Sequence, residues 1–175
     1  MAFSCAPSQS FRPAGAPGLG REHELGLAVS SVRPRPYVTE PTREVGQAWW
    51  ATRLGGPWSL ATLVAFDASA LAAGAALRID ALHTRKFTLS AEAEGGFGWG
   101  AVSLPVALRV WKDVGAYCSP RIGNWGAVLT PFLPCGVQGE LLDGLLLRGE
   151  LQLSWAEFEA YNRRAHWGVA VAHQW

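Results

Sequence analysis

The sequence predicts an all-β protein that folds as a closed, antiparallel, up-and-down β-barrel. Its clearest signal is a strict alternation of apolar and polar residues in several segments of strand length, which places the apolar side chains on one face of each strand. The chain also combines 20 glycines with 9 tryptophans, a mixture common in closed β-structures with tight corners. No amphipathic run of helical period and helix length is present, apart from a short candidate at 155–164.

Composition limits both the domain organisation and the partners. A length of 175 residues suits one domain, and 49% hydrophobic with 17% charged residues excludes a disordered chain. Residues 1–20 are rich in Pro, Gly, Ser and Ala and are predicted to be a flexible tail, which leaves 21–175 as the barrel domain. The net charge of +1 has no basic excess, so no nucleic-acid partner is expected.

The strands can be placed from the alternation. It is clearest at 87–93, 100–110, 145–155 and 167–175, and weaker strands are predicted at 22–31, 44–54, 58–66, 74–83 and 114–123. A segment at 127–138 is doubtful because Pro131 and Pro134 cannot donate to a sheet. We prefer a barrel of eight strands, and ten strands result if the proline segment and one split strand are admitted. Turn signals separate the strands, including Gly55-Gly56-Pro57 and the glycines at 95–98.

Residues 58–77 imitate a transmembrane helix, because Asp67 is the only charge in about 20 residues, the usual length of a membrane span. Many of these residues are small, and a central Asp disfavours insertion. We therefore predict two strands with a bend between Asp67 and Ala73.

Alternation alone leaves open which face of the barrel is wet. In a soluble lipocalin-like barrel or sandwich that binds an apolar ligand, the apolar face points inward, whereas in a membrane barrel it points outward to lipid. The low lysine count, two in the whole chain, favours the membrane solution, in which charged residues of the polar face form a paired network in the lumen. The candidates for this network are Glu92, Glu94, Arg109, Arg148 and Glu150.

Aromatic residues near strand ends support the same solution. Trp167 and Trp175 are eight residues apart on one apolar face, a separation of about 27 Å along a strand. Tilt reduces this to about 20 Å, close to the apolar band of about 25 Å between the aromatic girdles of membrane barrels. Trp155, Trp167 and Trp175 are therefore candidate girdle residues, and two core tryptophans of a sandwich are the alternative.

The ending Trp167-Gly-Val-Ala-Val-Ala-His-Gln-Trp175 resembles the C-terminal strand of bacterial outer-membrane β-barrel proteins, which alternates and closes on an aromatic residue. The resemblance extends in pattern over 22–175. It implies an outer-membrane location, the lipid bilayer as a partner, and recognition of the last strand by the barrel-assembly machinery. The residues before Cys5 lack the basic and apolar regions of an export signal, so the sequence does not give the export route.

The three cysteines allow two expectations. Cys5 follows small residues and precedes a Pro/Ser linker, as in bacterial lipoproteins, so it is a candidate lipidation site, with a free cysteine in the tail as the alternative. Cys118 and Cys135 form a disulfide if the compartment is oxidising and remain two thiols if it is not.

No catalytic or cofactor-binding constellation is predicted. The sequence has no P-loop, no GxGxxG and no CxxC, and His23, His83 and His173 lack a short metal-ligand spacing. Ser154 and His166 have the chemistry of a nucleophile and a base, but both lie on the polar phase and no orienting acid can be placed. We therefore expect a structural or interaction protein that is not an enzyme and binds no metal or cofactor.

Overall fold

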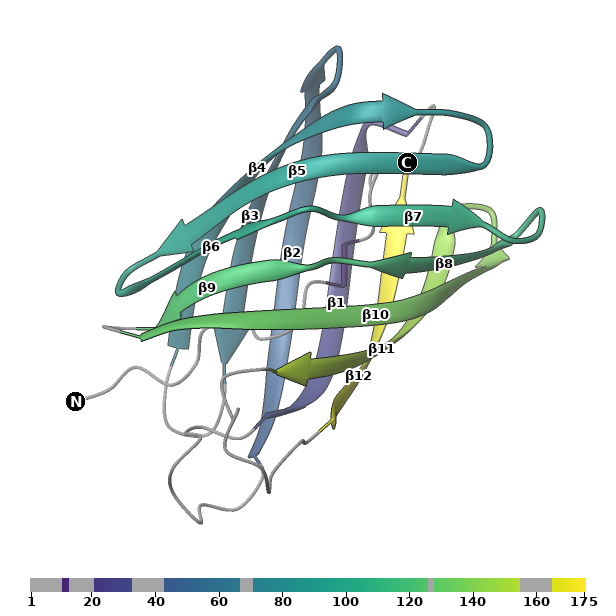
Figure 1. The fold of residues 1–175 in the computed structure, drawn as a ribbon. Helices are drawn as coiled ribbons and strands as arrows, with labels where there is room; N and C mark the ends of the chain where they lie inside the picture. The colour runs from purple at the N-terminus through teal and green to yellow at the C-terminus, as the bar shows by residue number, and fades with distance from the viewer. Residues whose placement is uncertain (1–10, 13–20, 33–42, 67–70, 126–127, 155–164) are drawn as a thin grey trace.

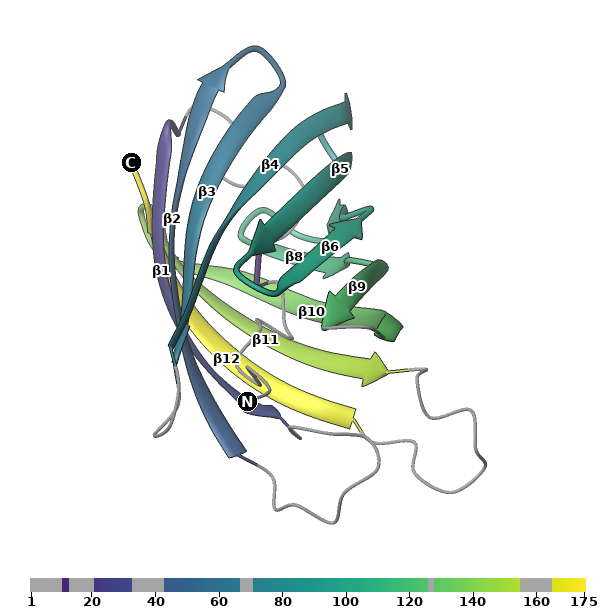
Figure 2. The same cartoon turned by 90° about the vertical axis from the view of Figure 1, so that its left-hand side faces the viewer.

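The computed structural model describes residues 11–12, 21–32, 43–66, 71–125, 128–154 and 165–175, which form a single closed antiparallel sheet (Figures 1 and 2). Its twelve strands are β1 (His23–Val32), β2 (Arg43–Gly55), β3 (Trp58–Phe66), β4 (Leu71–His83), β5 (Phe87–Gly96), β6 (Trp99–Ser103), β7 (Val106–Arg109), β8 (Val114–Cys118), β9 (Arg121–Trp125), β10 (Val128–Leu142), β11 (Leu145–Ser154) and β12 (Ala165–Gln174).

The twelve strands make ten staves of the barrel. Both β6 and β7 pair with β5, and both β9 and β8 pair with β10, so each of these pairs is one interrupted stave. In Figure 1, β6 continues in line into β7, and β8 into β9. The interruptions fall at Leu104-Pro105 and Ser119-Pro120, where each proline lacks the amide hydrogen that a continuous ladder needs.

The barrel closes along its last strand. β12 pairs with β11 on one side and with β1 on the other, and the Trp175 carbonyl accepts hydrogen bonds from the amides of Glu22 (2.9 Å) and His23 (3.1 Å). The hairpin of β10 and β11 completes the circle. Because every strand has two neighbours, the sheet has no open edge.

The strand count of eight is wrong, and ten is the number of staves. The decisive segment is the one containing Pro131 and Pro134, which belongs to β10, the longest strand at 15 residues. Each proline removes only one donor, and β10 keeps its register with β8, β9 and β11 through both prolines, shifting only near its end, between Glu140 and Leu142. The strands expected at 58–66 and 74–83 are confirmed, and they divide the apolar segment between β3 and β4. Among the described residues, no helix is long and apolar enough to cross a membrane.

The faces of the sheet have inverted polarity. On β1 the apolar Leu25, Leu27 and Val29 are exposed, whereas Glu24 and Ser30 on either side of this run are fully buried. β3 alternates exposed and buried positions along its whole length, and Leu147, Leu151, Val169 and Val171 are exposed on β11 and β12. The apolar phase therefore faces outward, as in a barrel embedded in lipid.

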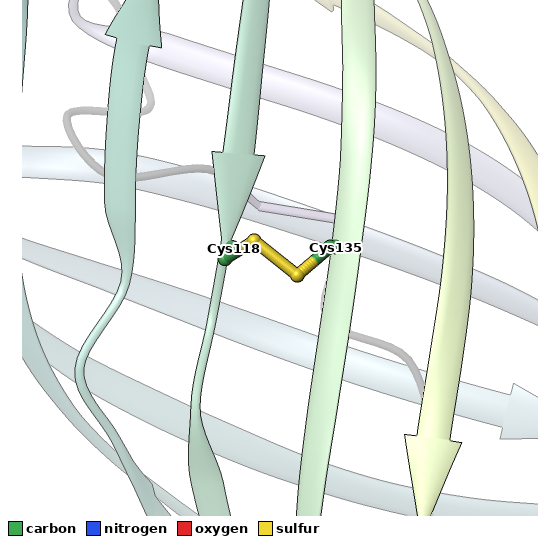
Figure 3. The surroundings of a disulfide bond; sticks show 2 residues. All are labelled: Cys118 and Cys135. Atoms are coloured by element: carbon green, nitrogen blue, oxygen red, sulfur yellow. A yellow bond between two sulfur atoms is a disulfide. The ribbon is translucent and has the colours of Figure 1, made fainter.

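Cys118 on β8 and Cys135 on β10 are directly opposite each other and form a disulfide (Figure 3). The bond joins two staves next to the interruption at Ser119-Pro120, where the Ser119 amide donates to the Pro134 carbonyl (2.8 Å). It therefore reinforces the wall beside the point where the ladder is weakest.

The outward phase predicts different responses from two leucines of β11. Leu151 is 57% exposed on the outer face and Leu146 is 8% exposed on the inner face. Leu146→Ala should lower the free energy of unfolding by about 2–5 kcal/mol because it leaves a cavity. Leu151→Ala should cost much less, since lipid fills the space, whereas Leu151→Arg should cost about 2–4 kcal/mol near the bilayer midplane. Urea unfolding in lipid vesicles measures all three. Equal losses for the two alanine variants would contradict the outward phase.

The disulfide predicts a second stability change. It closes a loop with a sequence separation of 17, and removing such a bond by a double Cys118→Ala and Cys135→Ala substitution should lower the free energy of unfolding by about 3 kcal/mol. In the wild-type protein, Cys118 and Cys135 should react with a maleimide only after reduction, which peptide mass spectrometry can resolve. Labelling of both before reduction would show that the bond is absent.

Candidate functional site: a buried charge network in the lumen

Eight charged side chains meet inside the barrel, and nearly all of their surface is buried. Four are carboxylates and four are guanidiniums: Glu24, Glu92, Glu94, Glu150, Arg12, Arg78, Arg121 and Arg148. The period of two that places leucines and valines outside places these residues inside. Because a buried charge is costly without a partner, the network must be explained by its pairing.

The first group, which we call the Glu24 cluster, joins the four strands β11, β12, β1 and β2. The guanidinium of Arg148 donates to both carboxylate oxygens of Glu24, from Nη1 to Oε1 (2.8 Å) and from Nη2 to Oε2 (2.7 Å). Trp49 donates its indole N–H to Glu24 Oε1 (2.7 Å), and the Gln174 amide donates to Glu24 Oε2. Glu24 is thus held by a bidentate ion pair and two neutral donors, the geometry that best offsets burial.

A glycine on β1 gives Trp49 its position. Gly26 is the ladder partner of Trp49, and a β-carbon on Gly26 would lie 2.0 Å from the indole. The ring therefore lies flat over the β1 backbone, from where its N–H reaches Glu24 two residues away. Glycine is required here by close approach.

The second group, the Glu92 cluster, lies on β4, β5 and β9. Arg78 donates from Nε to Glu92 Oε2 (2.9 Å), and its Nη2 lies 2.8 Å from the same oxygen. Glu94, two residues further on the same face of β5, forms an ion pair with Arg121. In the sheet order, β5 is separated from β1 by three staves on one side, so the two clusters occupy different walls of the lumen.

Residues Phe11 and Arg12, which we call the lumen dipeptide, connect the two walls. On the Glu24 side, the Phe11 amide donates to Glu150 Oε2 (3.0 Å) and the Phe11 carbonyl accepts from Arg148 Nη1 (2.7 Å). On the other side, Arg12 Nη2 lies 2.9 Å from Glu92 Oε1 and 3.6 Å from Glu94 Oε2, and the Arg12 carbonyl accepts from Arg78 Nη2 (2.7 Å). Both residues are buried, with 0% and 3% of their surface exposed.

The conformation of Phe11 indicates that the lumen imposes it. The Phe11 ring stacks on Trp49, with centroids 6.3 Å apart and planes within 5°. Its φ of 45° lies in the left-handed region, which costs a bulky residue about 1–3 kcal/mol. Such a conformation persists only where surrounding contacts hold it, and here the hydrogen bonds with Glu150 and Arg148 and the stacking on Trp49 do so.

Most of the residues predicted for the lumen are found there, with one correction. Glu92, Glu94, Arg148 and Glu150 lie inside the barrel as described above. Arg109 does not join them, because it occupies the last position of β7 and its side chain is exposed. Its position on the strand faces inward, but it lies at the rim of the barrel, where an inward-facing side chain is exposed to solvent.

Four members of the network were missed. Arg78 lies between two apolar residues and Glu24 precedes the apolar Leu25, both on strands that the sequence marked only weakly, so the alternation there was the available signal. Arg121 follows a proline at an interruption, which masks the pattern. Arg12 carries no signal at all, since it lies in the segment 1–20 predicted to be a tail. Only residues 11 and 12 of that segment are described, and the domain division stays a prediction.

The predicted aromatic girdle is described in part. Trp167 and Trp175 are 49% and 47% exposed on the outer face, at opposite ends of β12. Trp175 lies 5.6 Å from His23 and 5.6 Å from His173, measured between ring centroids, and His23 is 6.3 Å from Trp50. Trp155 lies outside the described residues. One end of the barrel thus carries an outer aromatic group that adds Trp50 and two histidines to Trp175.

The described residues contain no group of three or more His, Cys, Asp or Glu side chains that could hold a metal ion. His23 and His173 pack against Trp175, and His83 Nδ1 lies 3.1 Å from the Thr88 hydroxyl. Gln152 is the ladder partner of His166. The side chain of Ser154 lies outside the described residues, so a Ser154–His166 pair is not tested.

Comparison with known proteins identifies the fold and no family. No family model and no curated protein matches the chain. Among solved structures, it is similar to a KdgM porin solved in complex with disordered oligogalacturonate, with a TM-score of 0.54 and 10% identity over 87% of this chain and 99% of that one. The outer-membrane protein Ail of Yersinia pestis in a nanodisc has a TM-score of 0.46 and 9% identity, over 89% and 99% of the two chains. The match to the porin shows that the two chains share the fold of a small closed β-barrel.

The Glu24 cluster predicts that its arginine is important for stability. Arg148→Ala leaves Glu24 buried without its bidentate partner and should lower the free energy of unfolding by about 3–5 kcal/mol. Arg85→Ala, in the exposed turn between β4 and β5, is the matched control and should change it little. Both are measured by urea unfolding in lipid vesicles. Small and equal effects would mean that the lumen is solvated and the pair is not buried.

Proposed function

We propose that this chain is a small bacterial outer-membrane β-barrel that acts as a structural or interaction protein and catalyses no reaction. The observation that carries the proposal is the inverted polarity of the wall, with paired charges inside and apolar side chains outside. A soluble barrel that binds an apolar ligand needs an apolar interior, whereas the interior here holds eight buried charged side chains beside a cluster of mostly small apolar ones. The lipocalin-like alternative therefore lacks support.

The connections between strands support one orientation in the membrane. The C-terminal residue Trp175, the start of β1 and the short turns 56–57, 84–86, 110–113 and 143–144 all lie at one end of the barrel. The other end carries the turn 97–98 and the strand ends that flank the two longest connections, 33–42 and 155–164. In outer-membrane barrels, short turns face the periplasm and longer connections face outward. Contacts with extracellular partners would therefore be made at the end that carries 33–42 and 155–164.

The last strand supports a role in assembly. β12 closes the barrel between β11 and β1, and its alternating outer face ends on the exposed aromatic Trp175. We assign to this strand the signal that the barrel-assembly machinery recognises. Cys5 lies outside the described residues, and its lipidation stays a prediction from the sequence.

Membrane insertion tests the proposal. The chain, fused to a bacterial export signal, should be recovered in the outer-membrane fraction and should require detergent for extraction. In gel electrophoresis the unheated sample should migrate differently from the boiled one, because a closed barrel resists unfolding by the detergent. A monomer that stays fully soluble without detergent would overturn the proposal.

A further inference from the structure

We propose that the lumen of this barrel is a cation-conducting pathway that the chain closes itself, with the lumen dipeptide Phe11–Arg12 as the plug. This goes beyond the proposed structural role, because it assigns the barrel an ion-conducting activity. It also assigns the lumen a binding site of stated chemistry, for an aromatic residue followed by a guanidinium.

The site recognises the dipeptide at each of its groups. The Phe11 ring stacks on the indole of Trp49, its amide donates to the Glu150 carboxylate, and its carbonyl accepts from Arg148. The Arg12 carbonyl accepts a hydrogen bond from Arg78, and the Arg12 guanidinium forms ion pairs with Glu92 and Glu94. These partners come from strands on different sides of the barrel, so the dipeptide spans the lumen and obstructs it.

The wall does not depend on the plug for its own pairing. Glu24 is paired with Arg148, Glu92 with Arg78 and Glu94 with Arg121, and each pair joins two wall strands. The plug contributes second contacts to Glu92, Glu94, Arg78 and Arg148, which already have a wall partner, and a hydrogen bond to Glu150. It holds Phe11 in a left-handed conformation that its departure would relax. The barrel can therefore keep its shape with the plug displaced.

The size of the barrel provides a space that wall side chains need not fill. An eight-stranded barrel has an interior just wide enough for its own side chains, and the diameter grows with the number of strands. This barrel has ten staves, and buried residues from outside the wall, Phe11 and Arg12, occupy part of the extra width. Their removal would leave a water-accessible passage.

The charge of the wall determines which ions would pass. The buried wall groups of the two clusters are four carboxylates, Glu24, Glu92, Glu94 and Glu150, and three guanidiniums, Arg78, Arg121 and Arg148. The Arg53–Asp80 pair, whose side chains approach to 3.7 Å, adds no net charge. Arg12 supplies the balancing positive charge, so displacement of the plug leaves one negative charge in excess and a preference for cations.

Planar-bilayer recordings in a KCl gradient test the proposal, with the full chain compared with a variant that lacks residues 1–12. We expect the full chain to be silent or to open rarely, and the shortened variant to give discrete current steps whose reversal potential shifts toward the potassium equilibrium potential. Phe11→Ala and Arg12→Gln in the full chain should raise the frequency of opening. Arg85→Gln, in the exposed turn, removes the same charge elsewhere and should leave the recordings unchanged.

A peptide added in trans tests the chemistry of the site. The blocked peptide Ser-Phe-Arg-Pro, which copies residues 10–13, should close the shortened variant, and the same peptide with Glu in place of Arg should not.

The proposal is overturned if the shortened variant, shown by its heat-dependent migration to be folded, is as silent as the full chain. It is equally overturned if the full chain conducts as well as the shortened variant, or if the currents prefer anions. Should the shortened variant not fold, the two point variants decide, and recordings identical to those of the full chain would reject the plug. Each of these failures leaves heat-dependent migration and membrane insertion intact, so it is distinguishable from a failure of the proposed membrane location.

Discussion

Closure of the backbone hydrogen-bond ladder is the constraint on which the rest of this structure depends. Inside a bilayer an unpaired N–H or C=O has no water to bind, so a sheet that spans the membrane must have no edge. Here the Trp175 carbonyl pairs with the amides at the start of β1, and β12 fills the space between β1 and β11. The interrupted staves obey the same constraint, because the amides of Ser90, Leu104 and Ser119 donate to proline carbonyls on neighbouring staves and bridge the gaps in the ladder.

Closure then decides what the two faces can hold. The outer face meets lipid and can be uniformly apolar. Polar groups on the inner face are buried away from solvent, so they must pair with one another. The inner face therefore contains ion pairs that join different strands, Glu24 with Arg148 and Glu92 with Arg78. The same contacts that offset the cost of burial also hold neighbouring parts of the wall together. The lumen dipeptide adds a connection between the wall that carries Glu24 and the wall that carries Glu92.

The strands were predictable because their signal is local. Alternation and turn residues located nearly every stave, and the inward phase identified Glu92, Glu94, Arg148 and Glu150. The errors had local causes as well. The two prolines made the segment of β10 doubtful because proline has no amide hydrogen to donate. A long strand with partners on both sides can nevertheless lose two hydrogen-bond donors and keep its register. The alternation also placed Arg109 inside, because it gives the face of a residue but not its position along the barrel axis. Arg109 lies at the rim.

By itself, the sequence determined that the chain is a β-barrel whose apolar and polar residues occupy opposite faces, because the period of two is a property of each strand alone. Only the tertiary structure decided the remaining features: ten staves, the pairing of Cys118 with Cys135, which glutamate meets which arginine, and the burial of Phe11 and Arg12 between the walls. The physical reason is that these depend on register and on closure, which bring together residues more than a hundred positions apart, such as Glu24 and Arg148.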